Sequence, residues 1–286
     1  MCAGFRYSGT PYPLISLVRS FSGIGVKIGI IGAGNMGFAL LRGFANAGLL
    51  DTHGFMVSDV DEKKLSRAAE LGAKTTRSNQ ELVQWADLVI LAVKPAVVEE
   101  VLREVGENLQ NKLLISVAAG ISTALLEKWT SARVIRMMPN LCAEVGELAA
   151  CYSLGSRTQE ADEKVVQELF GKIGKVWRVD ESLMSAVTGL SGSGPAFFFH
   201  LLEAAAAAGV ELGLPPDLAK ELAAQTAKGA AAMVLAGLDP GELVRRVCTP
   251  GGTTIEGMKV LEERKAAETL KEAIKAAAKR AEELSR

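Results

Sequence analysis

A glycine-rich turn at residues 32–37 carries the most recognisable chemistry in the chain, because Gly32, Gly34 and Gly37 have the spacing Gly-x-Gly-x-x-Gly. In dinucleotide sites the first glycine permits a tight turn, the second lets the pyrophosphate approach the backbone, and the third lets a helix pack closely on a strand. Free N–H groups at the amino end of that helix favour an anion. Because the turn lies between a strand pattern and a helix pattern, we interpret it as a dinucleotide site rather than a purely structural turn.

An acidic residue, Asp59, ends the next predicted strand about 20 residues further on, where an acid accepts hydrogen bonds from the adenosine ribose. Such an acid repels a 2′-phosphate and favours NADH. Lys63, Lys64 and Arg67 follow within two helical turns. They either reach that phosphate, which favours NADPH, or form an ordinary solvated helix face. The choice between NADPH and NADH stays open on these residues.

Two more turns follow predicted strands, at Ala92–Pro95 and Ala118–Gly120. In an open α/β sheet, ligands bind beyond the carboxyl ends of the strands. Both turns are therefore predicted to line the nicotinamide half of the site. For Lys94, a plain surface charge is an equally good interpretation.

Two turns in the second half of the chain combine glycine with hydroxyl groups, at residues 191–194 before Pro195 and at residues 251–254 before Ile255. Proline suits the first position of a helix, and glycines let backbone N–H groups converge on an anion. We interpret both turns as sites for a substrate carboxylate; the alternative is that they merely begin helices. The predicted substrate-binding residues are Ser191, Gly192, Ser193, Gly251, Gly252, Thr253 and Thr254.

Alternating strands and helices are needed to position these turns, and residues 27–180 show that pattern. Short runs of Val, Ile and Leu predict strands at Lys27–Ile31, Phe55–Ser58, Leu88–Val93, Leu113–Val117, Val134–Met138 and Leu148–Ser153. Amphipathic segments predict helices at Met36–Ala47, Glu62–Leu71, Ala96–Asn108, Thr123–Trp129 and Gln159–Ile173. Such apolar strands are typical of a parallel sheet covered on both faces. We expect an α/β, Rossmann-like dinucleotide-binding domain.

Residues 181–286 predict an all-helical C-terminal domain, since no strand pattern follows Val179. The first of its helices is apolar on nearly all sides, and so small a domain supplies little cover for it. We infer a dimer interface there, with His200 as a core or interface residue rather than a catalytic one. The predicted helices are Ala196–Leu212, Pro216–Ala236, Glu242–Val247, and Ile255–Ser285 with breaks.

Composition argues against several classes of function. The 33 acidic and 32 basic residues nearly cancel, which indicates no nucleic-acid partner. No apolar run reaches the ~20 residues of a membrane helix, so no membrane partner is expected. Four scattered cysteines and two histidines predict neither a metal site nor a disulfide framework, and favour the cytoplasm. Residues 1–26 contain two arginines and no acid, typical of an organellar transit peptide or of a simple N-terminal extension.

Five segments together resemble one family, the pyrroline-5-carboxylate reductases. In order along the chain they are KIGIIGAGNMGFAL (27–40), LAVKP (91–95), RMMPN (136–140), AVTGLSGSGPA (186–196) and TPGGTTIEG (249–257). The resemblance runs from about Lys27 to the end. The last two segments are far more specific than the glycine turn.

This resemblance implies an oxidoreductase that reduces 1-pyrroline-5-carboxylate, a small imino acid, to L-proline with NADPH or NADH. That reaction is the last step of proline biosynthesis, and the family forms homodimers or larger homo-oligomers. The resemblance implies cofactor contacts from Gly32, Ala33, Asn35, Met36, Ser58, Asn79, Ala92, Lys94 and Pro95. The turns themselves add Gly34, Gly37, Asp59, Val93, Ala119 and Gly120.

Substrate contacts from Thr253 and Thr254 are also implied by the resemblance. An imine nitrogen arrives already protonated from water near neutral pH, so no histidine base is needed. A hydroxyl that orients the nitrogen is enough, because the cofactor carries the hard chemistry. We therefore predict Thr254 as the catalytic residue.

Two other functions stay open. A hydroxyacid dehydrogenase of similar layout uses a helix-borne lysine as general acid, but no lysine follows Gly194 before Lys220. A catalytically silent NAD(P)H-binding sensor or assembly partner need not keep the hydroxyls of the Gly-Gly-Thr-Thr turn. The chain departs from the family pattern at Leu141, Cys142 and Cys248, which leaves room for a shifted substrate.

Overall fold

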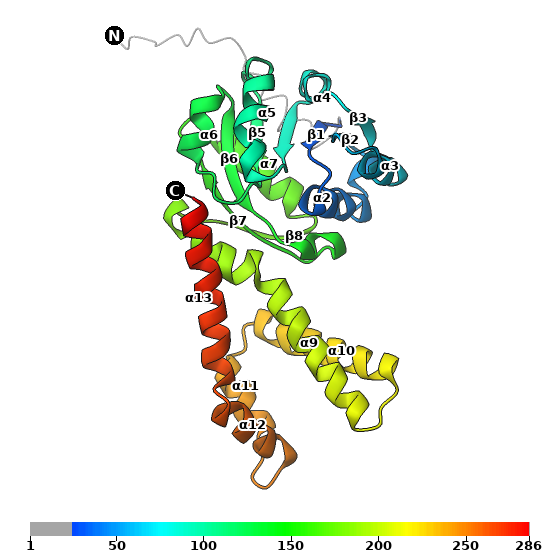
Figure 1. The fold of residues 1–286 in the computed structure, drawn as a ribbon, viewed down its shortest axis with the longest axis vertical. Coiled ribbons are helices and arrows are strands. Elements are labelled where there is room, and N and C mark those ends of the chain that lie inside the picture. Colours follow the sequence, from blue (N-terminus) through cyan, green and yellow to red (C-terminus); the bar gives the residue numbers. More distant parts are fainter. Residues whose placement is uncertain (1–24, 286) are drawn as a thin grey trace, which may run out of the picture. The chain divides into compact units, whose positions relative to one another are not determined.

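The computed structural model describes residues 25–285, which form two compact units (Figure 1). One unit contains residues 25–192 and 278–285, and the other contains residues 193–277. The sequence predicts the boundary at residue 180. The structure keeps the next segment with the first unit, because the short helix α8 (Met184–Val187) and the π-helical turn Thr188–Gly192 contact strand β7 (Leu148–Leu154). Of the predicted extension at 1–26, residues 1–24 lie outside the described part of the chain.

An eight-stranded sheet in the order β3-β2-β1-β4-β5-β6-β7-β8 forms the first unit. Neighbouring strands are parallel except β6 and β7, which are antiparallel. The predicted Rossmann-like fold is thus confirmed. Besides β7, the strands are β1 (Lys27–Ile31), β2 (Gly54–Ser58), β3 (Lys74–Thr76), β4 (Leu88–Leu91), β5 (Leu113–Ser116), β6 (Arg133–Met138) and β8 (Gly174–Arg178).

Helices cover both faces of this sheet. Successive residues of a strand point to opposite faces, so the apolar strands present side chains to both layers of helices. In β4, for example, Ile90 joins one apolar cluster and Leu91 the other. Helices α2 (Asn35–Asn46), α3 (Glu62–Glu70) and α7 (Glu160–Phe170) contribute buried side chains to the first cluster. Helices α4 (Asn79–Trp85), α5 (Val98–Val105) and α6 (Thr123–Trp129) contribute to the second.

Two strands and two helices of this unit were not predicted: β3, β8, α4 and α8. Strand β3 is three polar residues long, and α4 has only two buried residues, Leu82 and Val83. Strand β8 is an edge strand whose residues are all at least partly exposed. The sheet is parallel, as expected, except at the pair of β6 and β7, which only the short 3₁₀ turn Leu141–Val145 joins. Parallel neighbours need a longer crossover connection.

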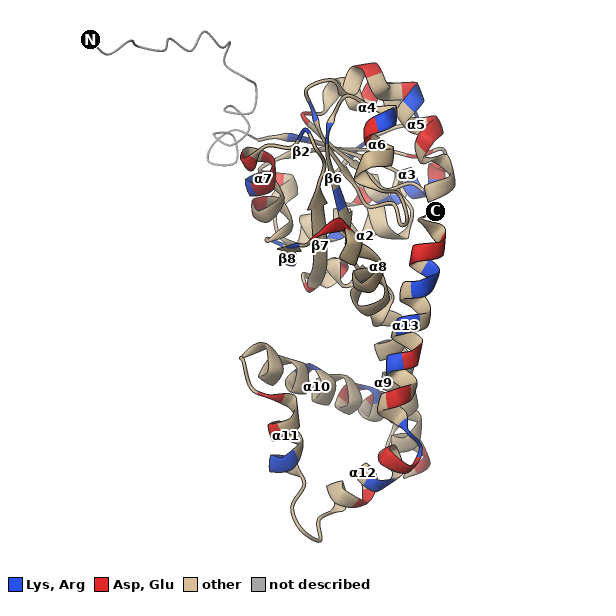
Figure 2. Ribbon diagram, turned by 90° about the vertical axis from the view of Figure 1, so that its left-hand side faces the viewer, with Lys and Arg blue, Asp and Glu red and all other residues tan. Residues whose placement is uncertain are grey.

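Helices alone make up the second unit, as the sequence predicts. They are α9 (Gly194–Glu211), α10 (Pro216–Leu235), α11 (Pro240–Val247), α12 (Thr253–Glu263) and the first part of α13 (Ala266–Leu284). Helices α9 and α10 approach closely through small residues, since a Cβ added to Gly209 would lie 3.0 Å from the Cβ of Ala219. These two helices carry few charges, whereas α13 carries both signs along its length (Figure 2).

Most apolar side chains of this unit lack cover within the chain. Gly194 is the only buried residue of α9 and Ala219 the only one of α10, and none is buried in α11 or α12. Phe198 is 59% exposed and Leu212 86%. His200 is also exposed, so it is not a core residue of this chain, and its predicted place in an interface stays a prediction.

Candidate dinucleotide and substrate sites

The glycine turn after β1 has the geometry that its spacing predicts. Gly32 has a φ of +99°, and its N–H donates to the carbonyl oxygen of Ser58 at 2.8 Å. A Cβ at Gly32 would lie 2.7 Å from the carbonyl oxygen of Ala92, and a Cβ at Gly37 would collide with the carbonyl oxygen of Gly32. Both positions therefore require glycine, the first for its backbone angle and the second for close packing of α2 on the turn.

Open space lies at the middle glycine. A Cβ added to Gly34 would meet nothing within 4 Å, although Gly34 caps α2. No side chain caps this end of the helix, so its first N–H groups face that space. The arrangement fits a pyrophosphate, because the helix end offers donors and a favourable dipole and the missing side chain leaves room.

The carboxylate of Asp59 is tied to this turn. Its Oδ2 accepts the Ala33 N–H at 2.8 Å and its Oδ1 accepts the Asp61 N–H at 2.9 Å. The Lys64 ammonium lies 3.4 and 3.5 Å from the two oxygens. Burial alone would raise the pKa of Asp59, but the two N–H groups and Lys64 together hold it below its ordinary value. Asp59 is therefore ionised, and Lys64 offsets part of its charge.

Polar and basic side chains surround the same corner of the site. The Ser58 hydroxyl donates to Oδ1 of Asn79 at 2.8 Å, so these two predicted cofactor residues meet. Arg67, one helical turn after Lys64, stacks over the Phe38 ring of α2 at 4.0 Å from its centroid. Lys64 and Arg67 thus share the face of α3 that is turned toward Asp59 and α2.

The turns after β4 and β5 lie at the same edge of the sheet. Backbone hydrogen bonds join each turn to the end of the neighbouring strand. The Ala92 N–H donates to the Ile31 oxygen at the end of β1, and the Val117 N–H donates to the Leu91 oxygen at the end of β4. Ala92 and Val93 lie directly beside Gly32. Lys94 and Pro95 are exposed, Ala119 is half-buried and Gly120 is buried.

The first hydroxyl-rich turn is anchored to the sheet of the first unit. The Ser191 hydroxyl donates to the Ala149 oxygen at 2.8 Å, and the Asn140 amide donates to the Ser191 oxygen at 3.3 Å. The hydrogen of that hydroxyl is therefore already used. Ser193 precedes α9 without a side-chain cap bond, which leaves its hydroxyl and the nearby backbone for a ligand.

The second hydroxyl-rich turn begins α12 in the helical unit. Gly251 has a φ of +74°, and Gly252 caps the helix without any side-chain hydrogen bond. Thr253 and Thr254 are the first two helical residues, the former exposed and the latter half-buried. Two hydroxyls and the unbonded N–H groups of a helix start are thus gathered at this one turn.

Some residues around the site were missed by sequence reasoning. Arg136 and Asn140 were quoted only as part of the RMMPN segment, and Glu181 was not singled out. An arginine inside an apolar strand was the available signal, because a buried charge is rare unless it is paired. Arg136 is indeed 4% exposed and pairs with Glu181.

Residues 25–285 contain no group of three His, Cys, Asp or Glu side chains arranged to hold a metal ion. Within the same residues, every helix is too short or too polar to cross a membrane.

Comparison with known proteins defines the class. Residues 27–120 match a family described as NADP oxidoreductase, coenzyme F420-dependent. The fold, the glycine turn and this match define a nicotinamide-dinucleotide oxidoreductase. Residues 181–284 match a family described as pyrroline-5-carboxylate reductase dimerisation, which indicates homo-oligomerisation. The chain belongs to the pyrroline-5-carboxylate reductase family, and the resemblance found in its motifs is confirmed.

Relatives across most of the chain support this assignment. The chain is 42% identical to the pyrroline-5-carboxylate reductase of Pisum sativum, over 90% of its own length and 96% of the relative's. It is 44% identical to the pyrroline-5-carboxylate reductase of Arabidopsis thaliana, over 91% of this chain and 95% of the relative. The structure of the Plasmodium falciparum pyrroline carboxylate reductase with NADP bound superposes with a TM-score of 0.84 at 30% identity. The match covers 92% of this chain and 100% of that structure. The Coxiella burnetii pyrroline-5-carboxylate reductase superposes with a TM-score of 0.81 at 33% identity, covering 91% of this chain and 99% of that structure.

Proposed function

We propose that the protein reduces 1-pyrroline-5-carboxylate to L-proline with a reduced nicotinamide dinucleotide. The observation that carries the proposal is the 42–44% identity to two enzymes of that name over at least 90% of the chain. The open, uncapped helix start at Gly34 supports it, because it fits the pyrophosphate that the reaction requires. When bound, the reduced cofactor supplies the hydride for the imine carbon.

The chain's own residues have two tasks in this reaction. The amino end of α2 and residues 32–37 hold the pyrophosphate, and the turns 92–95 and 119–120 line the nicotinamide half. The Thr254 hydroxyl orients the protonated imine nitrogen, while the turns 191–193 and 251–253 hold the substrate carboxylate with backbone N–H groups and hydroxyls. No ionisable base is needed, since the nitrogen brings its own proton.

The preferred cofactor in this proposal is NADPH. Asp59 would disfavour a 2′-phosphate, but two N–H groups and Lys64 already satisfy its carboxylate. Lys64 and Arg67 present two positive charges at the same corner, where a 2′-phosphate needs them. The match of residues 27–120 to an NADP oxidoreductase family supports the same choice.

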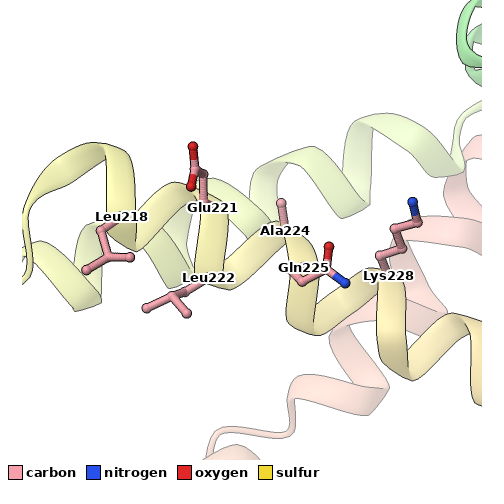
Figure 3. A pocket seen from close by; sticks show the side chains of 6 residues that line it. All are labelled: Leu218, Glu221, Leu222, Ala224, Gln225 and Lys228. Atoms are coloured by element: carbon pink, nitrogen blue, oxygen red, sulfur yellow. The ribbon is translucent and has the colours of Figure 1, made fainter.

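A second copy of the chain covers the exposed helices in this proposal, so the enzyme works as a homodimer or a larger assembly. The exposed surface of α10 supports it, since the side chains drawn in Figure 3 all project from this one helix and line an open surface. The residues lining it are Leu218, Glu221, Leu222, Ala224, Gln225 and Lys228. For the compartment we propose the cytoplasm, on the grounds of the few, scattered cysteines.

The experiment is a spectrophotometric assay that follows NADPH and NADH oxidation with 1-pyrroline-5-carboxylate. A matched substrate, 1-pyrroline, has the same imine but no carboxylate and should give a much lower kcat/KM. Turnover of both imines at equal rates would contradict a carboxylate site. Oxidation of 3-hydroxyacids in the reverse assay, with no imine reduction, would instead establish the hydroxyacid dehydrogenase. Binding of NADPH with neither activity would establish the silent relative.

A further inference from the structure

We propose that Glu181 is a positioning residue, which holds the loop Val117–Ser122 in the conformation needed for hydride transfer. The inference rests on the proposed function, in which Ala119 and Gly120 of this loop line the nicotinamide half of the site. Glu181 lies in the 3₁₀ turn Glu181–Leu183 of the first unit, far from the loop in sequence. Its carboxylate nevertheless bonds directly to the loop's end.

The contact with the loop is made by both carboxylate oxygens. Oε1 of Glu181 accepts the N–H of Thr123 at 2.8 Å, and Oε2 accepts the Thr123 hydroxyl at 2.5 Å. Thr123 is buried at 7% exposure and lies three residues after Gly120. These two bonds fix where the loop ends.

The same carboxylate is held by a buried charge. Nη1 of Arg136 lies 3.1 Å from Oε1 of Glu181, and the Arg136 side chain is 5% exposed. Its Nε is buried without a hydrogen-bond partner among the described residues, so Glu181 is its main compensation. Arg136 is in register with Ser116, where the loop begins, and Ser116 accepts the Ala118 N–H. One end of the loop is therefore bonded to this ion pair through Thr123, and the other end follows a strand residue paired with Arg136.

Glu181 is not needed to begin helix α6. Ser122 already caps that helix by accepting the Leu125 N–H at 3.2 Å. The Ser122 cap serves a different N–H group, so the Glu181 bonds fix the position of Thr123, where the loop ends. Position matters here, since a displacement of about 1 Å near reacting groups lowers a rate by roughly a hundredfold.

The test uses Glu181→Gln, which keeps the shape and one acceptor but removes the charge facing Arg136. Thr123→Val is a milder second variant, which removes only the hydroxyl bond. The matched control is Glu127→Gln, the same change at a carboxylate of helix α6 whose oxygens accept the Ser156 hydroxyl and the Arg157 N–H, away from the loop. The first readout is hydrogen–deuterium exchange of the cofactor-free protein. Peptides covering residues 117–123 should exchange roughly tenfold faster in Glu181→Gln, with the rest of the unit unchanged.

The second readout separates binding from chemistry. In Glu181→Gln, kcat with NADPH and 1-pyrroline-5-carboxylate should fall roughly ten- to a hundredfold. The Kd for NADPH should stay within about twofold, because the adenosine and pyrophosphate contacts are intact. Glu127→Gln should lower the unfolding midpoint slightly and keep the wild-type kcat.

Three results would overturn the proposal. The first is that hydrogen–deuterium exchange and kcat are both unchanged in Glu181→Gln. The second is faster exchange across the whole unit together with a lower unfolding midpoint, because Glu181 would then be a purely structural residue. The third is an equal loss of kcat in Glu127→Gln. If the wild-type protein does not reduce 1-pyrroline-5-carboxylate, the proposed function fails, but the exchange measurement still decides whether Glu181 orders the loop.

Discussion

Replacing Lys64 by glutamine tests whether this lysine decides the cofactor preference. The substitution removes the charge beside Asp59 but leaves both backbone hydrogen bonds of the Asp59 carboxylate in place. A bound 2′-phosphate would lose a cation and would face the Asp59 charge without its offset. Lys63 supplies the matched control, because it is the adjacent lysine on the same helix, whereas the ion pair with Asp59 is made by Lys64.

The size of the effect follows from the geometry. A pair of charges about 4 Å apart is worth ~1 kcal/mol in water and ~4 kcal/mol at an effective dielectric of ~20. The Lys64 side chain is 39% exposed, so solvent screening places its contribution between these limits. We take about 2 kcal/mol, which corresponds to a roughly 30-fold loss in kcat/KM for NADPH. NADH lacks the phosphate, so its kcat/KM should change less than about threefold on the same scale.

The assay is steady-state kinetics with each cofactor at a fixed concentration of 1-pyrroline-5-carboxylate. It compares the wild type, Lys64→Gln and Lys63→Gln at low and high ionic strength, since salt screens a partly exposed charge. The NADPH loss in Lys64→Gln should shrink at high salt. An equal loss for NADH and NADPH would refute the reasoning, and so would an equal NADPH loss in Lys63→Gln.

Three other outcomes are expected. Thr254→Val should lower kcat/KM for the imine roughly ten- to two-hundredfold, as expected for a lost bond worth ~1.5–3 kcal/mol, with unchanged NADPH affinity by fluorescence quenching. Wild-type kinetics would show that the hydroxyl has no part in the reaction. Asp162→Asn should lower the free energy of unfolding by about 3 kcal/mol in urea, because it strips the buried partner of Arg133, while the surface variant Glu160→Gln changes it little. Light scattering should give at least twice the 30.2 kDa chain mass; a folded monomer would rule out the proposed dimer.

The sheet and its major helices were predictable because their burial follows a simple period. Largely apolar runs indicated β1, β4 and β5, since these strands lie between two covering layers, and 3.6-residue spacing indicated α2 and α5, which bury one face against the sheet. The edge elements β3 and β8 were not predictable in this way. Their side chains are largely exposed, so no apolar pattern marks them, and pairing with a neighbour holds them in the sheet.

The candidate site was also predictable only in part. Backbone requirements at Gly32 and Gly37 follow from the spacing alone, because only glycine satisfies them. The ion pair of Arg136 and Glu181 joins residues 45 positions apart, and no local pattern connects them. Long-range polar contacts of this kind depend on which strands become neighbours, which the sheet order decides.

Asp59 illustrates why residue type alone gives an ambiguous cofactor preference. An acid after the second strand is ordinarily a ribose ligand that excludes a 2′-phosphate. Here its oxygens accept the N–H groups of Ala33 and Asp61, and Lys64 lies against both oxygens. Asp59→Ser would therefore relieve repulsion of a phosphate but also remove the acceptor that holds the glycine turn, and the two effects on NADPH binding have opposite signs. Substitution of Lys64 changes only the charge, which is why it separates cofactor preference from the integrity of the turn.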